Sequence, residues 1–436
     1  FYVREGNALD QEALKRGTSV YFPNMVIPML PERLSNIICS LRPKEDRLAY
    51  SVLMTVSPRG VVKDYSIRES IIRSKRRFSY EEVEAILEGG GRRGHQGGED
   101  PAVLDMLQRM WKLSTLLTKK RMKEGSIDFE TSEAKFRFDE EGNPTEIIKK
   151  VRLRSHRLVE EFMLLANQTV ARHIGLARRE EHRKPFLYRI HDAPDPDRIR
   201  ELSAFVSQFG FKLHTDGGVR SKDLQRLLDQ VRGTDVENVI NEVALRAMAK
   251  AVYSEQNIGH YGLAFDYYAH FTSPIRRYPD LVVHRLLKEY ARSSSLQRRQ
   301  EVARRLPFIA RQSSAMEKVA MEAERAAVKV MQVEYMKRHL GDEFDAIVSG
   351  VVRFGIFVEV VDLLVEGMIH VRDLQDDYYI YDEQKYSLIG QATGKRYRLG
   401  DMVRVKVIRV NPEEREIDFA IAEQAQAGGG YRKGRR

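Results

Sequence analysis

The chain has 436 residues, 42% of them hydrophobic and 31% charged, which is typical of folded globular proteins and excludes a disordered chain. Its 73 lysine and arginine residues exceed its 63 aspartate and glutamate residues by ten, so we expect an anionic partner such as nucleic acid. A single cysteine, Cys39, excludes a disulfide framework and fits a reducing cytoplasm, and no apolar run approaches the ~18 residues that a membrane span needs.

The first 340 residues have mixed periodicity, and helical spacing dominates after residue 155. Before that point, a glycine-rich stretch at 89–98 has no apolar side chain to bury and predicts a surface loop. Signals for the start of a helix then occur at Asp195, at Ser221 and, as capping boxes, at 234–237 and 314–317. The last of these predicts a long helix from Ser314 to Leu340 that is ended by Gly341.

After Gly341 the pattern changes to the alternation of short strands, at 344–348, 355–360 and 403–408. Five or so strands within about 80 residues fit a small closed barrel of the OB type. We therefore expect an α+β protein with three parts: a mixed α/β domain at 1–340, a five-stranded barrel at 341–425, and a basic, glycine-rich tail at 426–436.

The sequence has few of the motifs that mark common catalytic sites. Its eleven histidines lack metal-ligand spacing, and it has neither a nucleophile elbow nor a phosphate-binding GxxxxGK[ST] loop. The most informative segment is 260–281, which is rich in aromatic residues and contains Ser-Pro-Ile-Arg-Arg-Tyr at 273–278. A Ser-Pro turn followed by two arginines presents guanidinium groups, which suit bidentate binding of phosphate. Alternatively, Tyr267, Tyr268 and Phe271 are core residues and Arg276 pairs with a buried aspartate.

Three segments have highly specific wording and occur in one order. They are Pro-Met-Leu-Pro-Glu-Arg-Leu-Ser at 28–35, Thr-Ser-Pro-Ile-Arg-Arg-Tyr at 272–278, and Gly-Val-Val-Arg-Phe-Gly-Ile-Phe-Val at 350–358, which is followed by Glu-Gly-Met-Ile-His at 366–370. The first two resemble the RNB catalytic domain of the ribonuclease II/ribonuclease R family, and the third resembles an S1 RNA-binding domain. The resemblance covers nearly the whole chain and is closer to ribonuclease R than to ribonuclease II.

The resemblance implies a processive 3′-to-5′ hydrolytic exoribonuclease that degrades RNA to nucleoside 5′-monophosphates with Mg²⁺ as cofactor. The implied partner is the single-stranded 3′ end of RNA, bound without regard to sequence, in the cytoplasm and in company with the ribosome or RNA-decay machinery. By its place in the family motif, Arg276 would stabilise the transition state. The positions that match RNA-binding residues are Tyr21, Tyr80, Phe129, Glu160 and Arg277.

The roles that the family implies agree with the chemistry of sequence-independent binding. Tyr21 and Phe129 would clamp the terminal bases, since every base has a face on which a ring can stack. Glu160 would accept a hydrogen bond from a ribose 2′-hydroxyl, and Tyr80 would hold and orient the RNA end. On spacing alone, Tyr80 could simply pack at a helix start, Glu160 could belong to a polar helix face, and Phe129 could be a core residue.

In the barrel, Phe354, Phe357 and His370 fit an aromatic face for stacking on bases, with Arg372 nearby for phosphates. We expect one of the two phenylalanines to face the interior, because residues three apart point to opposite faces of a plain strand. A bulge at Gly355 would bring both to one side.

The chain departs from the family pattern in its carboxylates. The family holds Mg²⁺ with an Ile-Asp…Asp-x-Asp-Asp motif well before the position of Tyr21, but Asp10 is the one aspartate that precedes Tyr21 here. The aspartates at 192–197 and 376–377 lack that spacing. Because the chain also begins at Phe1, without an initiator methionine, we expect a C-terminal portion of an active enzyme that is inactive alone. The alternative is a family member that binds RNA without cleaving it.

Overall fold

The computed structural model describes residues 1–89, 100–129, 133–176, 184–215, 218–234, 236–382 and 386–422. Nearly all of the glycine-rich stretch at 89–98 and the whole basic tail at 426–436 lie outside these ranges. The chain divides into two compact units, each assembled from segments that are distant in sequence. The first unit consists of Phe1–Glu130, Val151–Arg232 and Val243–Glu324, and the second of Thr131–Lys150, Gly233–Glu242 and Arg325–Arg436.

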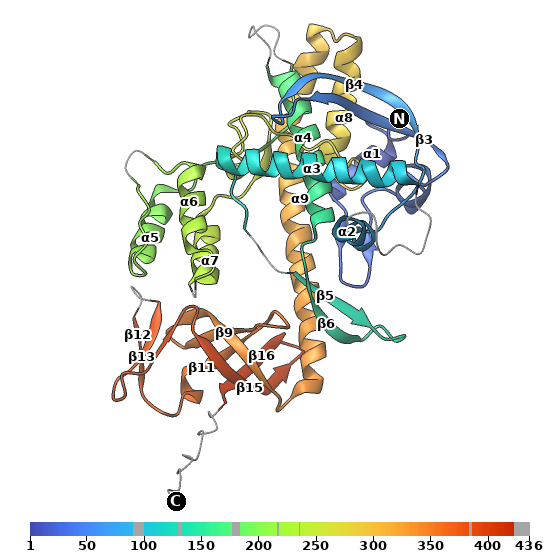
Figure 1. The fold of residues 1–436 in the computed structure, drawn as a ribbon. Coiled ribbons are helices and arrows are strands. Elements are labelled where there is room, and N and C mark those ends of the chain that lie inside the picture. The colour runs from blue at the N-terminus through green and yellow to red at the C-terminus, as the bar shows by residue number, and fades with distance from the viewer. Residues whose placement is uncertain are drawn as a thin grey trace, which may run out of the picture. The chain divides into compact units, whose positions relative to one another are not determined.

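Helices form most of the first unit (Figure 1). They are α1 (Ala8–Arg16), α2 (Tyr80–Glu88), α3 (Pro101–Glu124), α4 (Arg154–Gly175), α5 (Pro196–Ser207), α6 (Ser221–Val231), α8 (Tyr278–Arg292), the C-terminal part of α7 (Glu237–Ala247) and most of α9 (Leu296–Met336). Its described strands form antiparallel pairs: β1 (Val20–Tyr21) with β2 (Val26–Ile27), β3 (Asp46–Val56) with β4 (Val62–Arg73), and β7 (Tyr188–Ile190) with β8 (Val252–Ser254). None of the helices in the described ranges has both the length and the apolar character that crossing a membrane would require.

Two of the predicted helix starts are confirmed by the backbone. The carboxylate of Asp195 accepts a hydrogen bond from the backbone N–H of Asp197 at 2.8 Å and so caps α5, and α6 begins at Ser221. The core of the first unit is formed by α1, α4, α8, α9 and the β7–β8 pair, with buried side chains that include Ala13, Val170, Tyr188, Tyr278, Leu286 and Leu306. Both α2 and α3 pack against α4, so this helix joins the core to the α2–α3 layer (Figure 1).

The predicted helix start at Ser314 is wrong, because α9 runs without interruption through this point. The Ser314 hydroxyl donates to the carbonyl of Ala310 at 2.9 Å, one turn earlier, and accepts from the backbone N–H of Tyr253 at 3.0 Å. Glu317, the expected partner in the capping box, instead accepts a hydrogen bond from Arg189 at 2.6 Å. A serine inside a helix can satisfy its hydroxyl on the carbonyl four residues before it, so the capping-box pattern did not mark a boundary here.

The second unit is built on a closed barrel with the strand order β10–β11–β16–β15–β9, which confirms the predicted five-stranded OB-type barrel (Figure 1). Its strands are β9 (Glu343–Val352), β10 (Gly355–Val360), β11 (Val365–His370), β15 (Met402–Asn411) and β16 (Glu416–Ile421). Between β11 and β15 the chain forms a three-stranded sheet of β12 (Tyr379–Asp382), β13 (Ser387–Gly390) and β14 (Arg396–Arg398). The hairpin of β5 (Glu133–Phe138) and β6 (Pro144–Lys150) and the end of α9 add Phe136, Ile147, Val333 and Met336 to the barrel core.

The prediction that one of Phe354 and Phe357 faces the barrel interior is wrong. Phe354 lies in the turn before β10 and is 50% exposed, and Phe357 alternates with buried neighbours on that strand. The interior is filled by other apolar side chains, which include Ile356, Val358 and Phe419. The irregularity in strand register falls between Phe357 and Val358, and not at Gly355 as proposed. Phe419 supplies an aromatic ring to the core, so neither of the other two phenylalanines is needed there.

Candidate nucleic-acid site

A buried carboxylate fixes the turn that contains the two adjacent arginines. Asp280 is completely buried, and its oxygens accept from the backbone N–H of Ser273 at 2.8 Å and from the Arg277 guanidinium at 2.9 and 2.7 Å. The Ser273 carbonyl also accepts from the backbone N–H groups of Arg276 and Arg277, at 3.2 and 3.0 Å. A buried charge pair with this many hydrogen bonds is costly to break, so the turn is held in a single geometry. The buried aspartate therefore pairs with Arg277, and not with Arg276.

The Arg276 side chain is half-buried, and no acceptor in the described part of the chain binds its guanidinium. Its backbone carbonyl, in contrast, accepts from the backbone N–H of Ser19 at 2.9 Å and from the Thr18 hydroxyl at 3.0 Å. Tyr278, two residues later, donates its backbone N–H to the Gly17 carbonyl at 2.9 Å. These bonds place residues 17–19, just before the predicted site residue Tyr21, beside the 272–278 segment in the first unit.

Tyr21 follows directly from this paired segment. It lies in β1, its side chain is 46% exposed, and its backbone N–H donates to the Glu324 carboxylate on α9 at 2.7 Å. Its partner across the strand pair is Val26, which is also exposed. The backbone of Tyr21 is thus anchored while its ring is available to a ligand.

Three of the predicted RNA-binding residues line one cavity of about 290 Å³, which is at the small end of the range for ligand pockets. Tyr80 comes from the start of α2, Glu160 from α4, and Arg277 from the turn before α8. Apolar side chains such as Val159 and Met163 line the same cavity. The fold therefore brings together an aromatic ring, a carboxylate and a guanidinium from three segments that are far apart in sequence.

The lining also includes two polar residues, His156 and Asn167, that were not predicted from the sequence as site residues. His156 lies one helical turn before Glu160, and this spacing of four residues is a signal that could have identified it. Asn167 donates to the Tyr268 hydroxyl at 3.1 Å and accepts from the backbone N–H of Phe271 at 2.9 Å. Tyr268 and Phe271 are both buried, as the alternative interpretation of this segment expected, whereas Tyr267 is half-buried and packs against the core.

Phe129 does not line the cavity, but an ion-pair chain connects its neighbourhood to Glu160. Arg152 donates to Asp128 at 2.8 Å and also binds the Glu160 carboxylate. Burial disfavours the charge on Arg152, but the hydrogen bonds to both carboxylates outweigh it and raise the pKa of Arg152 above its usual value. The side chain of Phe129 is half-buried.

Among the described residues, no group of three or more histidine, cysteine, aspartate or glutamate side chains is placed to hold a metal ion. Asp10 is 2% exposed, and its carboxylate is bound by the Tyr278 hydroxyl at 2.9 Å and the Arg285 guanidinium at 2.6 Å. Asp195 caps α5, and Asp377 accepts from the backbone N–H of Tyr378 and from that of Ala392, between β13 and β14. These three aspartates are thus not placed to hold Mg²⁺, and we assign no chemical step to that ion.

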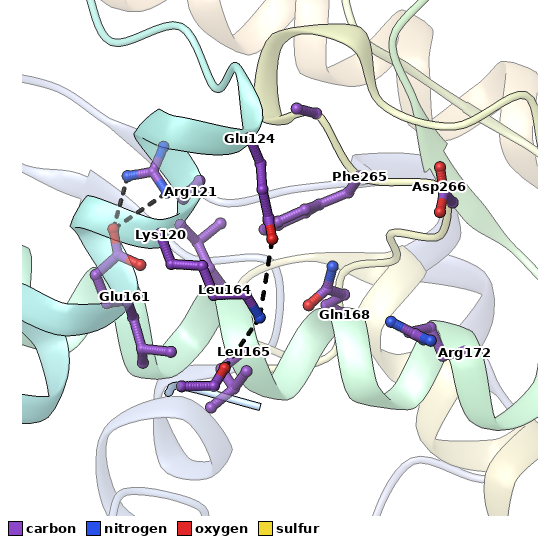
Figure 2. A pocket seen from close by; sticks show the side chains of 13 residues that line it. Lys120, Arg121, Glu124, Glu161, Leu164, Leu165, Gln168, Arg172, Phe265 and Asp266 are labelled. Atoms are coloured by element: carbon purple, nitrogen blue, oxygen red, sulfur yellow. Dashed lines mark hydrogen bonds and ion pairs between the residues drawn. The ribbon is translucent and has the colours of Figure 1, made fainter. Parts of the chain in front are cut away.

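Figure 2 shows a second cavity of the first unit, of about 260 Å³, between α3 and α4. Four of its charged side chains form two ion pairs: Arg121 lies 2.7 Å from Glu161, both of them buried, and Lys120 lies 4.0 Å from Glu124. Lys120 also donates to the Gly60 carbonyl at 3.0 Å. None of the predicted site residues lines this cavity. Its Arg121–Glu161 ion pair joins α3 to α4, whereas Lys120 and Glu124 both belong to α3.

In the second unit, the aromatic residues predicted for the barrel lie around one pair of strands. Gly355 of β10 pairs with His370 of β11, and the ring centroids of Phe354 and His370 are 6.5 Å apart. Strand alternation places Phe357 and His370 on the outer face. His370 accepts from the backbone N–H of Arg372 at 3.2 Å, and the Arg372 side chain is 72% exposed. The barrel thus presents the exposed ring of Phe354, the half-buried rings of Phe357 and His370, and the exposed cation of Arg372.

Both parts of the chain match known families in sequence. The RNB domain matches residues 1–293, and the S1 RNA binding domain matches residues 337–422. Ribonuclease R of Aquifex aeolicus is 42% identical over 433 residues, which are 98% of this chain and 59% of that protein. Ribonuclease R of Escherichia coli is 37% identical over an alignment of 446 positions, which covers 98% of this chain and 52% of that protein. The chain therefore spans between half and three fifths of the length of these curated relatives.

Solved structures agree with this match. RNase R of Mycoplasma genitalium in its apo form has a TM-score of 0.89 at 28% identity, and the alignment covers 97% of this chain and 65% of that one. The same values hold for that protein in complex with ribose methylated single-stranded RNA. Yeast Ssd1, a pseudonuclease, has a TM-score of 0.67 at 20% identity and thus shares the fold alone. From its sequence match and its fold, this chain belongs to the RNB family and carries an S1 RNA binding domain after its RNB domain.

Proposed function

We propose that this chain is the part of a 3′-to-5′ hydrolytic exoribonuclease that holds the 3′ end of single-stranded RNA and stabilises the attacked phosphate, with nucleoside 5′-monophosphates as products. The observation that carries this proposal is the contrast between two neighbours in the turn at 273–278. Arg277 is bound to Asp280, whereas the guanidinium of Arg276 has no acceptor among the described residues. A fixed turn that presents an unpaired guanidinium is suited to a phosphate on which charge develops.

The surrounding residues fit the binding of RNA without regard to its sequence. The exposed rings of Tyr21 and Tyr80 offer faces for stacking on bases, and Phe129 would join them as the second clamp residue. Glu160, in the same cavity as Tyr80, would accept from a ribose 2′-hydroxyl and so favour RNA over DNA. Phe354, Phe357, His370 and Arg372 would bind RNA on the barrel. RNase R of Mycoplasma genitalium in complex with single-stranded RNA supports RNA as the ligand.

The family resemblance implies Mg²⁺, which would activate water and neutralise charge on the phosphate. The residues described above supply no site for it, so our proposal for this chain is limited to RNA binding and phosphate stabilisation. An association with the ribosome or with RNA-decay machinery and a cytoplasmic location are further proposals, which rest on the resemblance and on the single cysteine.

The test uses the native polypeptide that contains this chain, with an RNA oligomer labelled at its 3′-terminal nucleotide and the same RNA labelled at its 5′ end. We expect Mg²⁺-dependent release of the 3′ label as a nucleoside 5′-monophosphate before any 5′ label is released. RNA that is bound but released uncut, with Mg²⁺ present, would contradict hydrolysis and favour the alternative of an RNA-binding protein.

A further inference from the structure

The cavity lined by Tyr80, Glu160 and Arg277 contains a stacked pair of rings that none of the sequence motifs indicated. The rings of Tyr80 and His156 have centroids 4.0 Å apart and planes inclined by 19°. Both residues line the cavity, and Tyr80 is 44% exposed, so its ring is supported by His156 while it remains accessible to a ligand. A stacked pair of this kind restrains the side chain of an otherwise exposed tyrosine.

His156 also holds the start of the helix that carries Glu160. Its Nδ1 accepts from the backbone N–H of Leu153, the residue that caps α4, at 3.1 Å. One residue before it, the backbone N–H of Ser155 donates at 3.0 Å to the carboxylate of Glu84, which belongs to α2. The histidine therefore stands at the junction of α2 and α4, the two helices that carry Tyr80 and Glu160.

We propose that His156 is a positioning residue for the RNA end: it holds the Tyr80 ring over the cavity by stacking, at a fixed place relative to Glu160. The proposal rests on the function proposed above, because it assumes that a base of the RNA reaches Tyr80. A tyrosine whose rotamer is already restrained loses less conformational entropy when a base stacks on it, so binding becomes tighter without any direct contact from His156. His156 is then expected to affect RNA binding chiefly through Tyr80.

Two substitutions separate the ring of His156 from its hydrogen bond. In His156→Phe the stacking ring is kept and the acceptor for the Leu153 N–H is lost, whereas in His156→Asn an acceptor is kept and the ring is lost. The matched control is His173→Asn, because His173 lies on the same helix and contacts a tyrosine, Tyr65, but does not line the cavity. Urea unfolding of each variant shows whether the fold is kept.

The probe is an RNA oligomer with 2-aminopurine as its 3′-terminal base, added without Mg²⁺, since stacking quenches the fluorescence of that base. We expect His156→Asn to raise Kd about two- to tenfold and to reduce the quenching, while His156→Phe and His173→Asn stay close to the unmodified chain. In a Tyr80→Ala background the loss from His156→Asn should disappear, because the histidine acts through the tyrosine.

Normal binding and quenching by a folded His156→Asn variant would overturn the positioning role and leave the proposed function intact. A loss in folded His156→Phe that equals or exceeds the loss in His156→Asn would also overturn it, since His156→Phe keeps the stacking ring and loses only the acceptor for the Leu153 N–H. If the unmodified chain failed to quench the probe at all, the proposed binding of the RNA end would itself fail, and the role of His156 with it.

Discussion

At the scale of single residues, two adjacent arginines have opposite environments. Arg277 precedes the first residue of α8 and reaches Asp280 in the first turn of that helix, so its charge is neutralised inside the protein. The Arg276 guanidinium has no acceptor in the described ranges, and its backbone is fixed by hydrogen bonds from Thr18 and Ser19. Arginine therefore fixes the turn at position 277 and is available to a phosphate at position 276.

This contrast predicts the kinetics of Arg276→Ala in the native polypeptide that contains this chain. If Arg276 acts on charge that develops in the transition state, kcat falls about 10²-fold or more while the Kd for RNA changes less than about threefold. Arg276→Lys keeps the charge without the planar fork and should be intermediate. Arg172→Ala, an exposed arginine on α4, is the control and should have unchanged kcat. Equal losses in affinity and rate for Arg276→Ala would make it a binding residue instead.

At the scale of elements, α2 begins at the residue that the site uses. Ser79 accepts from the backbone N–H of Glu82 at 3.1 Å, and the Glu82 carboxylate accepts from the backbone N–H of Ser79 at 2.6 Å, which forms a capping box. Tyr80 is the first helical residue after this cap. The position of its ring therefore depends on the first turn of a helix of nine residues, in addition to the stacking on His156.

Removing the cap with Ser79→Ala should lower the free energy of unfolding by about 1 kcal/mol, because the first turn of α2 loses a hydrogen-bond acceptor. The same variant should weaken the quenching of a 3′-terminal 2-aminopurine, since Tyr80 then samples more positions. Ser207→Ala on α5 is the control, because its hydroxyl donates to the Ser203 carbonyl within its own helix at 2.7 Å and caps nothing. Urea unfolding measures the first effect and fluorescence titration the second. A Ser79→Ala variant that is less stable but quenches normally would show that the cap does not position Tyr80.

At the scale of the whole molecule, the fold buries several histidines in uncharged form. Burial, together with the nearby charge of Arg189 and of His191, lowers the pKa of His260 to about 3. Burial also lowers the pKa values of His270 and His284, because it removes the water that would stabilise the charged form. Below the ordinary histidine pKa of 6.5, the unfolded chain therefore binds more protons than the folded one.

Stability should accordingly be fully present above pH 6.5 and decline as the pH falls from there toward 3, the opposite of what a salt-bridged histidine would give. His260→Asn keeps an acceptor for the backbone N–H of Leu263, which His260 binds at 3.2 Å, but does not titrate. We expect it to reduce the loss of unfolding free energy between pH 7 and pH 5 by an amount on the order of 1 kcal/mol. Urea unfolding at a series of pH values measures this. An identical decline in both proteins would mean that His260 is already uncoupled from folding.

Much of the fold could be predicted from local sequence signals. Alternation at 344–348, 355–360 and 403–408 lies within β9, β10 and β15, and Asp195 and Ser221 mark real helix starts. These signals are reliable because they reflect bonds and faces within a single element. The capping-box pattern at Ser314 failed for the converse reason, since its hydroxyl is satisfied within α9 and by Tyr253, a residue far away in the chain.

The candidate site was predicted in part, through motif positions. The tertiary structure places Tyr80, Glu160 and Arg277 around one cavity, leaves Phe129 outside it, and adds His156 and Asn167. No local pattern could show that a histidine at the start of α4 stacks on a tyrosine at the start of α2, because the contact depends on how the two helices pack.

The sequence by itself determined that the chain belongs to the RNB family, that a barrel follows a larger mixed domain, and which residues are candidates for binding RNA. Only the tertiary structure decided which of the two arginines pairs with Asp280, that both predicted barrel phenylalanines lie outside the core, and that the β5–β6 hairpin completes the barrel unit. The reason is physical: periodicity and capping act over a few residues, whereas the burial of Asp280, which pairs with Arg277, and the filling of the barrel by Phe419 depend on what packs against each element.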